Sequence, residues 1–116
     1  MSASAYKLNK LVAIVDKNGK QAQGMVRERF DLDPIAEKWA AFGWNVVEID
    51  GHCMEDILRG LGCADDSDKP TAIISSTVKG KGLEIAENHP SGMHNAPLTK
   101  EQYDNALAAL AGRDDA

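Results

Sequence analysis

Two stretches of this 116-residue chain carry groups suited to binding a cation or an anion. The first is residues 16–19 (DKNG), which directly follow the apolar run 11–15. The side-chain oxygen of Asn18 and a nearby backbone carbonyl are hard ligands of the kind that Mg²⁺ accepts, so this stretch could hold a cation that bridges phosphates. Asn and Gly are also common turn residues, and a plain turn is the alternative interpretation.

The second stretch is the glycine-rich loop at residues 78–82 (VKGKG), which resembles a phosphate-binding loop. It lacks the spacing of a P-loop and of a dinucleotide-binding fingerprint, so a flexible basic loop is the alternative. His94, further along the chain, could donate a hydrogen bond to a phosphate or take part in proton transfer. A surface position without a ligand is the alternative for His94, as it is for His52 and His89.

The spacing of other reactive residues disfavours several kinds of site. The two cysteines, Cys53 and Cys63, have nine residues between them and form no CxxC zinc motif. The serines at 75–76 lie in an apolar run without the GxSxG elbow of a serine hydrolase. The acidic residues 65–68 lack the glycine and the terminal glutamate of an EF-hand loop.

Composition bounds the partners and the location of the protein. A net charge of −5 and a pI of about 5.1 argue against nucleic acid as a partner. The sequence has no apolar run long enough to span a membrane. It also begins without the charged and apolar regions of a secretory signal. Two cysteines are too few for a disulfide scaffold, so we expect a cytoplasmic protein with reduced thiols.

The elements that must position the two loops alternate between strand and helix. Strands are predicted at residues 11–15, 45–49 and 71–77. The first run is apolar on both faces, as expected of a central strand in a parallel sheet. Strands that alternate with helices predict an α/β fold with a parallel sheet and flanking helices. Ligands bind such sheets at the carboxyl ends of the strands, which is where both loops begin.

Helix boundaries follow from capping signals. Asp33 is placed as an N-cap, with Pro34 at the first helical position and Gly43 closing the helix. Residues 99–102 (TKEQ) form a capping box that starts the last helix, with Gly112 after it. Residues 20–32 are predicted to be loop with a short helical turn. In the helix that follows residue 52, one face is predicted to carry Met54, Ile57, Leu58 and Leu61.

Taken in order along the chain, the same segments resemble the pyrophosphate-binding domain of transketolases. The closest likeness is to the N-terminal section of two-subunit bacterial transketolases. The matching segments are residues 5–19, 35–46, 50–52, 69–74, 77–82, 87–88, 93–94 and 96–97, and the helix around Tyr103. Several matches in the same order are far more specific than any one motif, and they cover nearly the whole chain.

The resemblance implies thiamine diphosphate as the cofactor, held through Mg²⁺ or Ca²⁺ by a GDG…N motif. Asn18 matches the Asn of that motif, and the peptide carbonyl of Lys20 matches the family's backbone ligand. His94 matches the histidine that lies against the cofactor diphosphate. The implied reaction is two-carbon ketol transfer between sugar phosphates, with the cofactor and the cation carrying the chemistry. No residue of this chain matches a catalytic residue of the family.

The chain also departs from the family pattern. The family places its GDG two to three dozen residues before the Asn, but only 17 residues precede Asn18 and none is Gly. Residues 1–116 are therefore expected to form a single partial domain without the GDG-bearing half. The pyrimidine-binding domain, with its activating glutamate, is missing as well. Lys20 and Gln23 stand where the family has an apolar residue and Asp, and Cys53 replaces the Asp of Gly-His-Asp.

These observations leave three hypotheses for the function. The first is a piece of a transketolase, inactive alone, that works with complementary transketolase chains or by self-association and exposes a sheet edge and apolar surface for them. The second is a decayed or excised domain that acts as an interaction or structural module. The third is a module that binds a phosphate ligand in the two loops.

Overall fold

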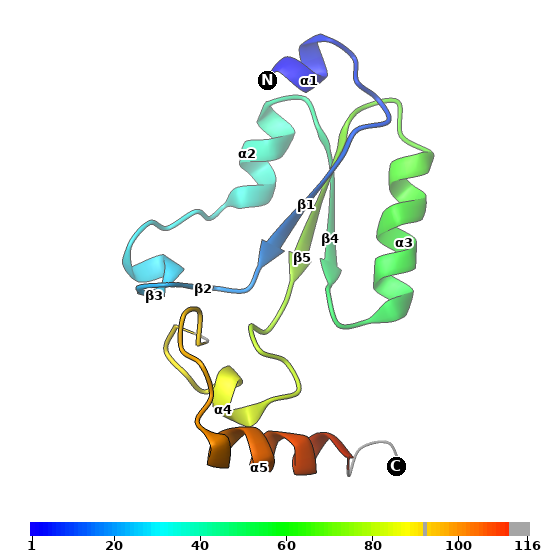
Figure 1. Ribbon diagram of the computed structural model, residues 1–116. Coiled ribbons are helices and arrows are strands. Elements are labelled where there is room, and N and C mark those ends of the chain that lie inside the picture. The colour runs from blue at the N-terminus through cyan, green and yellow to red at the C-terminus, as the bar shows by residue number, and fades with distance from the viewer. Residues whose placement is uncertain (92, 112–116) are drawn as a thin grey trace. The chain divides into compact units, whose positions relative to one another are not determined.

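The computed structural model describes residues 1–91 and 93–111, which fall into two compact units (Figure 1). Unit 1 comprises Met1–Asn18 and Asp31–Thr77. Unit 2 comprises Gly19–Phe30 and the chain from Val78 onward. Each unit therefore combines two separate stretches of the sequence, so neither can be cut out as one continuous segment.

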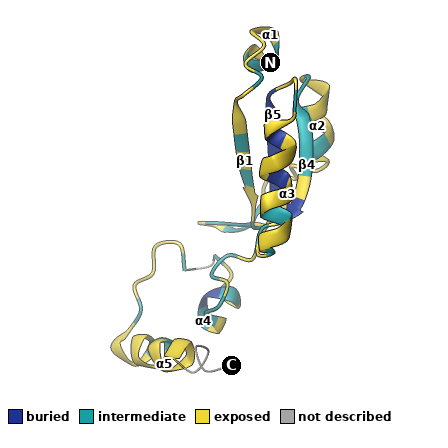
Figure 2. Cartoon of the chain, turned by 90° about the vertical axis from the view of Figure 1, so that its right-hand side faces the viewer, coloured by how far each residue is buried: buried dark blue, intermediate teal, exposed yellow. Residues whose placement is uncertain are grey.

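Unit 1 contains a three-stranded parallel sheet with helices on both faces. The strands are β1 (Val12–Lys17), β4 (Asn45–Asp50) and β5 (Thr71–Ser76), in the order β1-β5-β4. Three helices complete the unit: α1 (Ser2–Ala5), α2 (Ile35–Ala41) and α3 (Met54–Asp65). Helices α2 and α3 both pack against β4 and lie on opposite sides of the sheet (Figures 1 and 2). The predicted α/β fold with a parallel sheet and flanking helices is confirmed.

The core of unit 1 is centred on β5, every residue of which is buried except the last. Ile73 and Ile74 are fully buried, and each contributes about 1.5–3 kcal/mol to folding through the apolar surface removed from water. Helix α3 packs closely on the neighbouring strand β4 through small residues. A Cβ atom added at Gly60 would lie only 3.1 Å from Ile49 Cγ2.

The prediction that the first strand is central is wrong for the described sheet. Strand β1 pairs only with β5 and lies at the edge, with Ile14 64% exposed. Figure 2 shows this strand in the colours of intermediate and exposed residues, beside the buried β5. Apolar residues on both faces show that a strand is suited to burial. They do not show whether the strands and helices that would bury it belong to the same chain.

The start of α2 differs by one residue from the prediction, and α3 packs on the sheet through small residues. The N-cap of α2 is Pro34, and the carboxylate of the preceding Asp33 pairs with Lys17 Nζ at 2.7 Å. Gly43 ends the helix with a φ of 82°, as predicted. On α3 the buried residues are Gly60 and Ala64. Of the four residues predicted to share one face of this helix, three are exposed: Met54, Leu58 and Leu61.

Unit 2 is built from short elements. They are β2 (Lys20–Gln21), β3 (Gly24–Met25), the single turn η1 (Val26–Glu28), α4 (Glu84–Glu87) and α5 (Lys100–Ala111). Strands β2 and β3 form an antiparallel hairpin, which was not predicted, whereas η1 confirms the short helical turn. The capping box of α5 is confirmed: Thr99 N donates to Gln102 Oε1 at 2.9 Å, and Gln102 N donates to Thr99 Oγ1 at 3.2 Å. Gly112, expected after this helix, lies outside the described residues.

A search of the described residues for a helix with the length and apolarity needed to cross a membrane finds none.

Candidate functional site

Asp16 joins two side chains at the carboxyl end of the sheet in unit 1. It lies on β1 opposite Ser75 of β5. One carboxylate oxygen accepts a short hydrogen bond from Thr77 Oγ1, and the other accepts from Asn18 Nδ2 at 3.0 Å. Because the amide nitrogen of Asn18 faces the carboxylate, its side-chain oxygen is turned away from Asp16. The carboxylate therefore fixes the orientation of Asn18.

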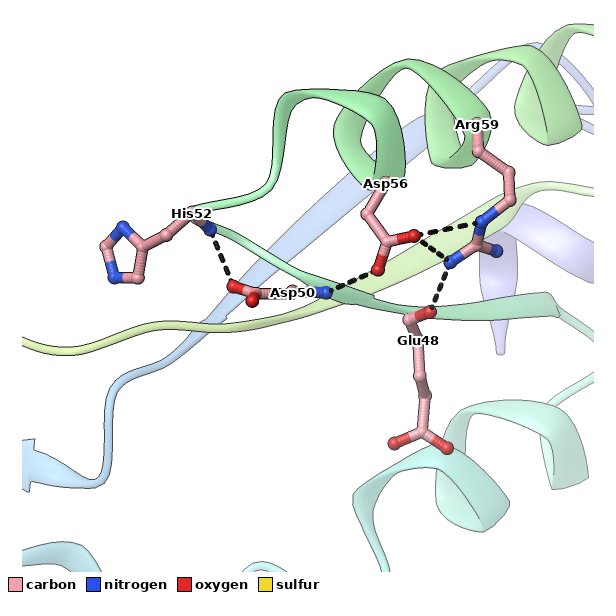
Figure 3. Close-up of polar contacts among 5 residues, drawn as sticks. All are labelled: Glu48, Asp50, His52, Asp56 and Arg59. Atoms are coloured by element: carbon pink, nitrogen blue, oxygen red, sulfur yellow. Dashed lines mark hydrogen bonds and ion pairs between the residues drawn. The ribbon is translucent and has the colours of Figure 1, made fainter.

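The turn from β4 to α3 is held by a second network at the same end of the sheet (Figure 3). Asp56 accepts a hydrogen bond from the backbone N of Asp50 at 3.0 Å and pairs with Arg59 at 3.0 Å. The bond from Asp50 and then the pair with Arg59 hold the pKa of the Asp56 carboxyl below its usual value. Asp50 Oδ1 accepts from the backbone N of His52 at 2.8 Å, and the imidazole of His52 points away from the Asp56–Arg59 pair.

Gly51 lets this turn pack against the end of β5. A Cβ atom at residue 51 would collide with Ser75 Oγ and with Thr77 Cγ2. The backbone N of Gly51 also donates to the carbonyl of Ser76 at 2.8 Å, which extends the pairing of β4 with β5 beyond the strands. The carboxyl end of the sheet is therefore a tightly packed surface that can present Asn18 in a fixed position.

In unit 2, Lys20 and His89 organise the loop that leads to His94. Lys20 Nζ donates to the carbonyls of Glu87 and His89, the second at 3.0 Å. His89 Nδ1 accepts from the backbone N of Ser91 at 3.3 Å and of Met93 at 3.2 Å. His94 itself is exposed.

The glycine-rich loop at residues 78–82 packs closely on α4. A Cβ atom at Gly80 would collide with Ala86, and the backbone N of Gly82 donates to Glu87 Oε1 at 2.7 Å. At least one backbone donor of the predicted phosphate-binding loop is thus satisfied within the protein. Sequence reasoning missed this bond because a Gly-rich pattern does not tell which acceptor its amides will meet.

The three residues predicted to bind the cofactor are divided between the units. Asn18 ends the first stretch of unit 1, while Lys20 and His94 belong to unit 2. Within unit 2, hydrogen bonds lead from Lys20 to Met93, the residue before His94. Sequence reasoning gave Asp16 no role in orienting Asn18. Its place at the end of a strand, two residues before Asn18, was the available signal.

Oxygen donors suited to a cation are present in each unit separately. The side-chain oxygen of Asn18 and the carbonyl of Lys20 are two neutral oxygen donors of the kind Mg²⁺ and Ca²⁺ accept. Among residues 1–91 and 93–111, no group of three or more His, Cys, Asp or Glu side chains is placed to hold a metal ion. The described residues could therefore contribute ligands to a bound cation but do not form a carboxylate-rich set for it.

Comparison with known proteins identifies the class to which this fold and these loops belong. Residues 1–114 match the family model described as transketolase, thiamine diphosphate binding domain, so the chain belongs to this family. The resemblance predicted from the sequence is confirmed.

Two relatives are named as subunits of transketolases. One is a subunit of the apulose-4-phosphate transketolase of Phocaeicola vulgatus; the chain is 40% identical to it over 114 residues, 97% of this chain and 40% of that protein. The other is the 6-deoxy-6-sulfo-D-fructose transketolase subunit SqwG of Clostridium sp. (strain MSTE9), with 38% identity over 111 residues, 95% of this chain and 40% of that protein. The chain thus spans about two fifths of the length of these relatives.

A solved structure supports the same fold. The chain superposes on transketolase from Campylobacter jejuni with a TM-score of 0.77 and 31% sequence identity, covering 93% of this chain and 17% of that one. The parallel sheet with flanking helices is therefore a part of the transketolase fold.

Proposed function

We propose that this chain is a component of a thiamine-diphosphate-dependent transketolase, which transfers a two-carbon ketol unit between sugar phosphates. The observation that carries this proposal is the match of residues 1–114 to the thiamine-diphosphate-binding domain of transketolases. The two relatives described above point the same way, since both are named as parts of transketolases.

In this proposal the chain contributes part of the cofactor site. The side-chain oxygen of Asn18 and the carbonyl of Lys20 would contribute ligands to the Mg²⁺ or Ca²⁺ of the cofactor site, and His94 would contact the cofactor diphosphate. The hydrogen bond from Asn18 to Asp16 supports this role, because it turns the amide oxygen of Asn18 away from the carboxylate of Asp16. When bound, the cofactor supplies the stabilisation of the carbanion that ketol transfer needs. The residues of this chain bind and orient it.

The 116 residues require a complementary transketolase chain, or a second copy, for activity. The exposed apolar side of β1 supports this requirement, since an apolar edge strand is a ready surface for another chain. The cytoplasm, with its reduced thiols, is the proposed location.

A calorimetric titration of the chain with thiamine diphosphate and Mg²⁺ tests the proposal. Saturable binding is expected, and Asn18→Ala is expected to weaken it. Asn105→Ala is the matched control, because Asn105 is an exposed residue of α5 in the other unit. The titration is repeated in the presence of a complementary transketolase chain. Absence of binding under both conditions, or equal weakening by the two substitutions, would overturn the proposed cofactor role.

A second candidate is a non-catalytic interaction module. It is favoured by the apolar surface exposed on α3 together with Cys53, which stands where the family has an acidic residue. Recovery of transketolase activity on adding a complementary chain would exclude this candidate.

A further inference from the structure

The side chain of Lys20 connects the hairpin of unit 2 to the loop that precedes His94. Its ammonium group donates to the carbonyls of Glu87 and His89, which lie 67 and 69 residues further along the chain. Glu87 is the last residue of α4, and the final carbonyls of a helix have no partner within the helix. A half-buried Lys side chain whose ammonium group meets two backbone carbonyls makes charge-assisted bonds, which are stronger than those between neutral groups.

From His89 the contacts continue toward His94 through the imidazole ring. His89 Nδ1 accepts hydrogen bonds from the backbone N of Ser91 and of Met93, so in the neutral ring the proton is on Nε2. Met93 has a φ of 55°, a left-handed conformation that a residue with a side chain adopts only at a cost. The bond from Met93 to His89 holds that conformation, and Met93 directly precedes His94.

We propose that Lys20 is a positioning residue that fixes residues 88–91 and 93–94 through its two bonds to backbone carbonyls. The ammonium holds the carbonyl of His89, the imidazole of His89 holds the amide of Met93, and Met93 sets the direction in which the chain enters His94. The consequence for cofactor binding rests on the proposed function, in which His94 meets the cofactor diphosphate. The side chain of Lys20 thus positions the loop, while its backbone carbonyl is the proposed cation ligand.

Amide hydrogen exchange measured by NMR on the 116-residue chain, without cofactor, tests the inference. In Lys20→Met the amides of Ser91 and Met93 are expected to exchange about 10- to 100-fold faster, the factor that corresponds to losing a hydrogen bond to a charged group. Lys20→Arg, which can also donate to two carbonyls, is expected to restore slow exchange. Lys100→Met removes the same charge from an exposed ion pair on α5 and is expected to leave both amides unchanged.

Amides within α5 serve as the internal reference. If the substitution only loosened unit 2 as a whole, exchange in α5 would rise to the same extent as at Ser91 and Met93. That result would overturn the inference. So would unchanged exchange in Lys20→Met, or fast exchange that persists in Lys20→Arg.

A titration of the same variants with thiamine diphosphate and Mg²⁺ separates this inference from the proposed function. Weaker binding by Lys20→Met, with normal binding by Lys20→Arg, supports both. If the wild-type chain does not bind the cofactor even with a complementary chain present, the proposed function fails. The exchange rates still decide whether Lys20 positions the loop.

Discussion

The N-cap of α3 is a position where the effect of a single side chain on the stability of unit 1 can be measured. Cys53 has a φ of −100° and a ψ of 114°, the extended conformation of an N-cap residue, yet its side chain makes no capping hydrogen bond. The amides of the first turn of a helix have no partner within the helix and benefit from such an acceptor. Cys53→Ser keeps the size of the side chain and supplies an oxygen, so it is expected to stabilise unit 1.

The size of the effect follows from the position of the residue. A Ser at an N-cap is worth about 0.5–2 kcal/mol relative to a residue that cannot cap. Cys53 is half-buried, and the loss of its sulfur from an apolar environment offsets part of that gain. The expected change is about 0.5–1 kcal/mol in the free energy of unfolding. For a unit of this size that corresponds to a rise of about 2–8 °C in Tm.

Tryptophan fluorescence during urea unfolding is a suitable assay. The chain has two tryptophans, Trp39 and Trp44, and both lie in unit 1 with ring centroids 4.7 Å apart. Cys63→Ser is the control, because Cys63 is an exposed residue of the same helix and the chemical change is identical. The control is expected to stay within about 0.5 kcal/mol of the wild type. An unchanged urea midpoint in Cys53→Ser, or an equal shift in both variants, would refute the capping argument.

Asp16→Asn is expected to destabilise unit 1 by about 1 kcal/mol because it weakens the hydrogen bond from Thr77. The midpoint of urea unfolding measures this change. An unchanged midpoint would mean that the carboxylate does not stabilise unit 1. Ile14→Lys is expected to abolish self-association and to change the stability of the single chain by no more than about 0.5 kcal/mol, because the side chain is exposed. Sedimentation equilibrium measures the self-association. If Ile14→Lys still associates, β1 is not part of the interface. The bond from Lys17 lowers the pKa of Asp33, so the stabilisation it gives is present above the unfolded pKa and is lost as the pH falls through the folded pKa. A carboxyl NMR titration should show the pKa of Asp33 returning toward its usual value in Lys17→Met, and no change there would contradict the assignment.

Local patterns in the sequence predicted the parts of the fold that depend on near neighbours. The capping box of α5 was predicted correctly because both of its hydrogen bonds join residues three positions apart. The alternation of strands and helices also predicted the parallel sheet from local information. The spacing of apolar residues within one segment is enough to distinguish a strand from a helix. The β2–β3 hairpin was missed because strands of two residues are too short to show a period.

Contacts between distant residues account for the differences. The carboxylate of Asp33 was predicted only as a helix cap, whereas it also pairs with Lys17, which lies 16 residues earlier. On α3, hydrophobicity pointed to the large residues, whereas close packing on the sheet selected Gly60 and Ala64. The side-chain contacts of Lys20 span nearly 70 positions, so no local pattern could have predicted them.

Gly51 imposes a constraint on how this sequence can evolve. Its backbone does not have a positive φ, so the requirement for glycine comes from the lack of space beside Ser75 and Thr77 rather than from backbone conformation. Gly62 on α3 offers the opposite case, since a side chain there would meet no atom within 4 Å. In a library of random variants selected for folding, residue 51 should remain glycine in nearly every survivor, while residue 62 should accept many amino acids. Related chains can therefore diverge freely along the outer surface of α3, but the turn after β4 can vary only on either side of one invariant position.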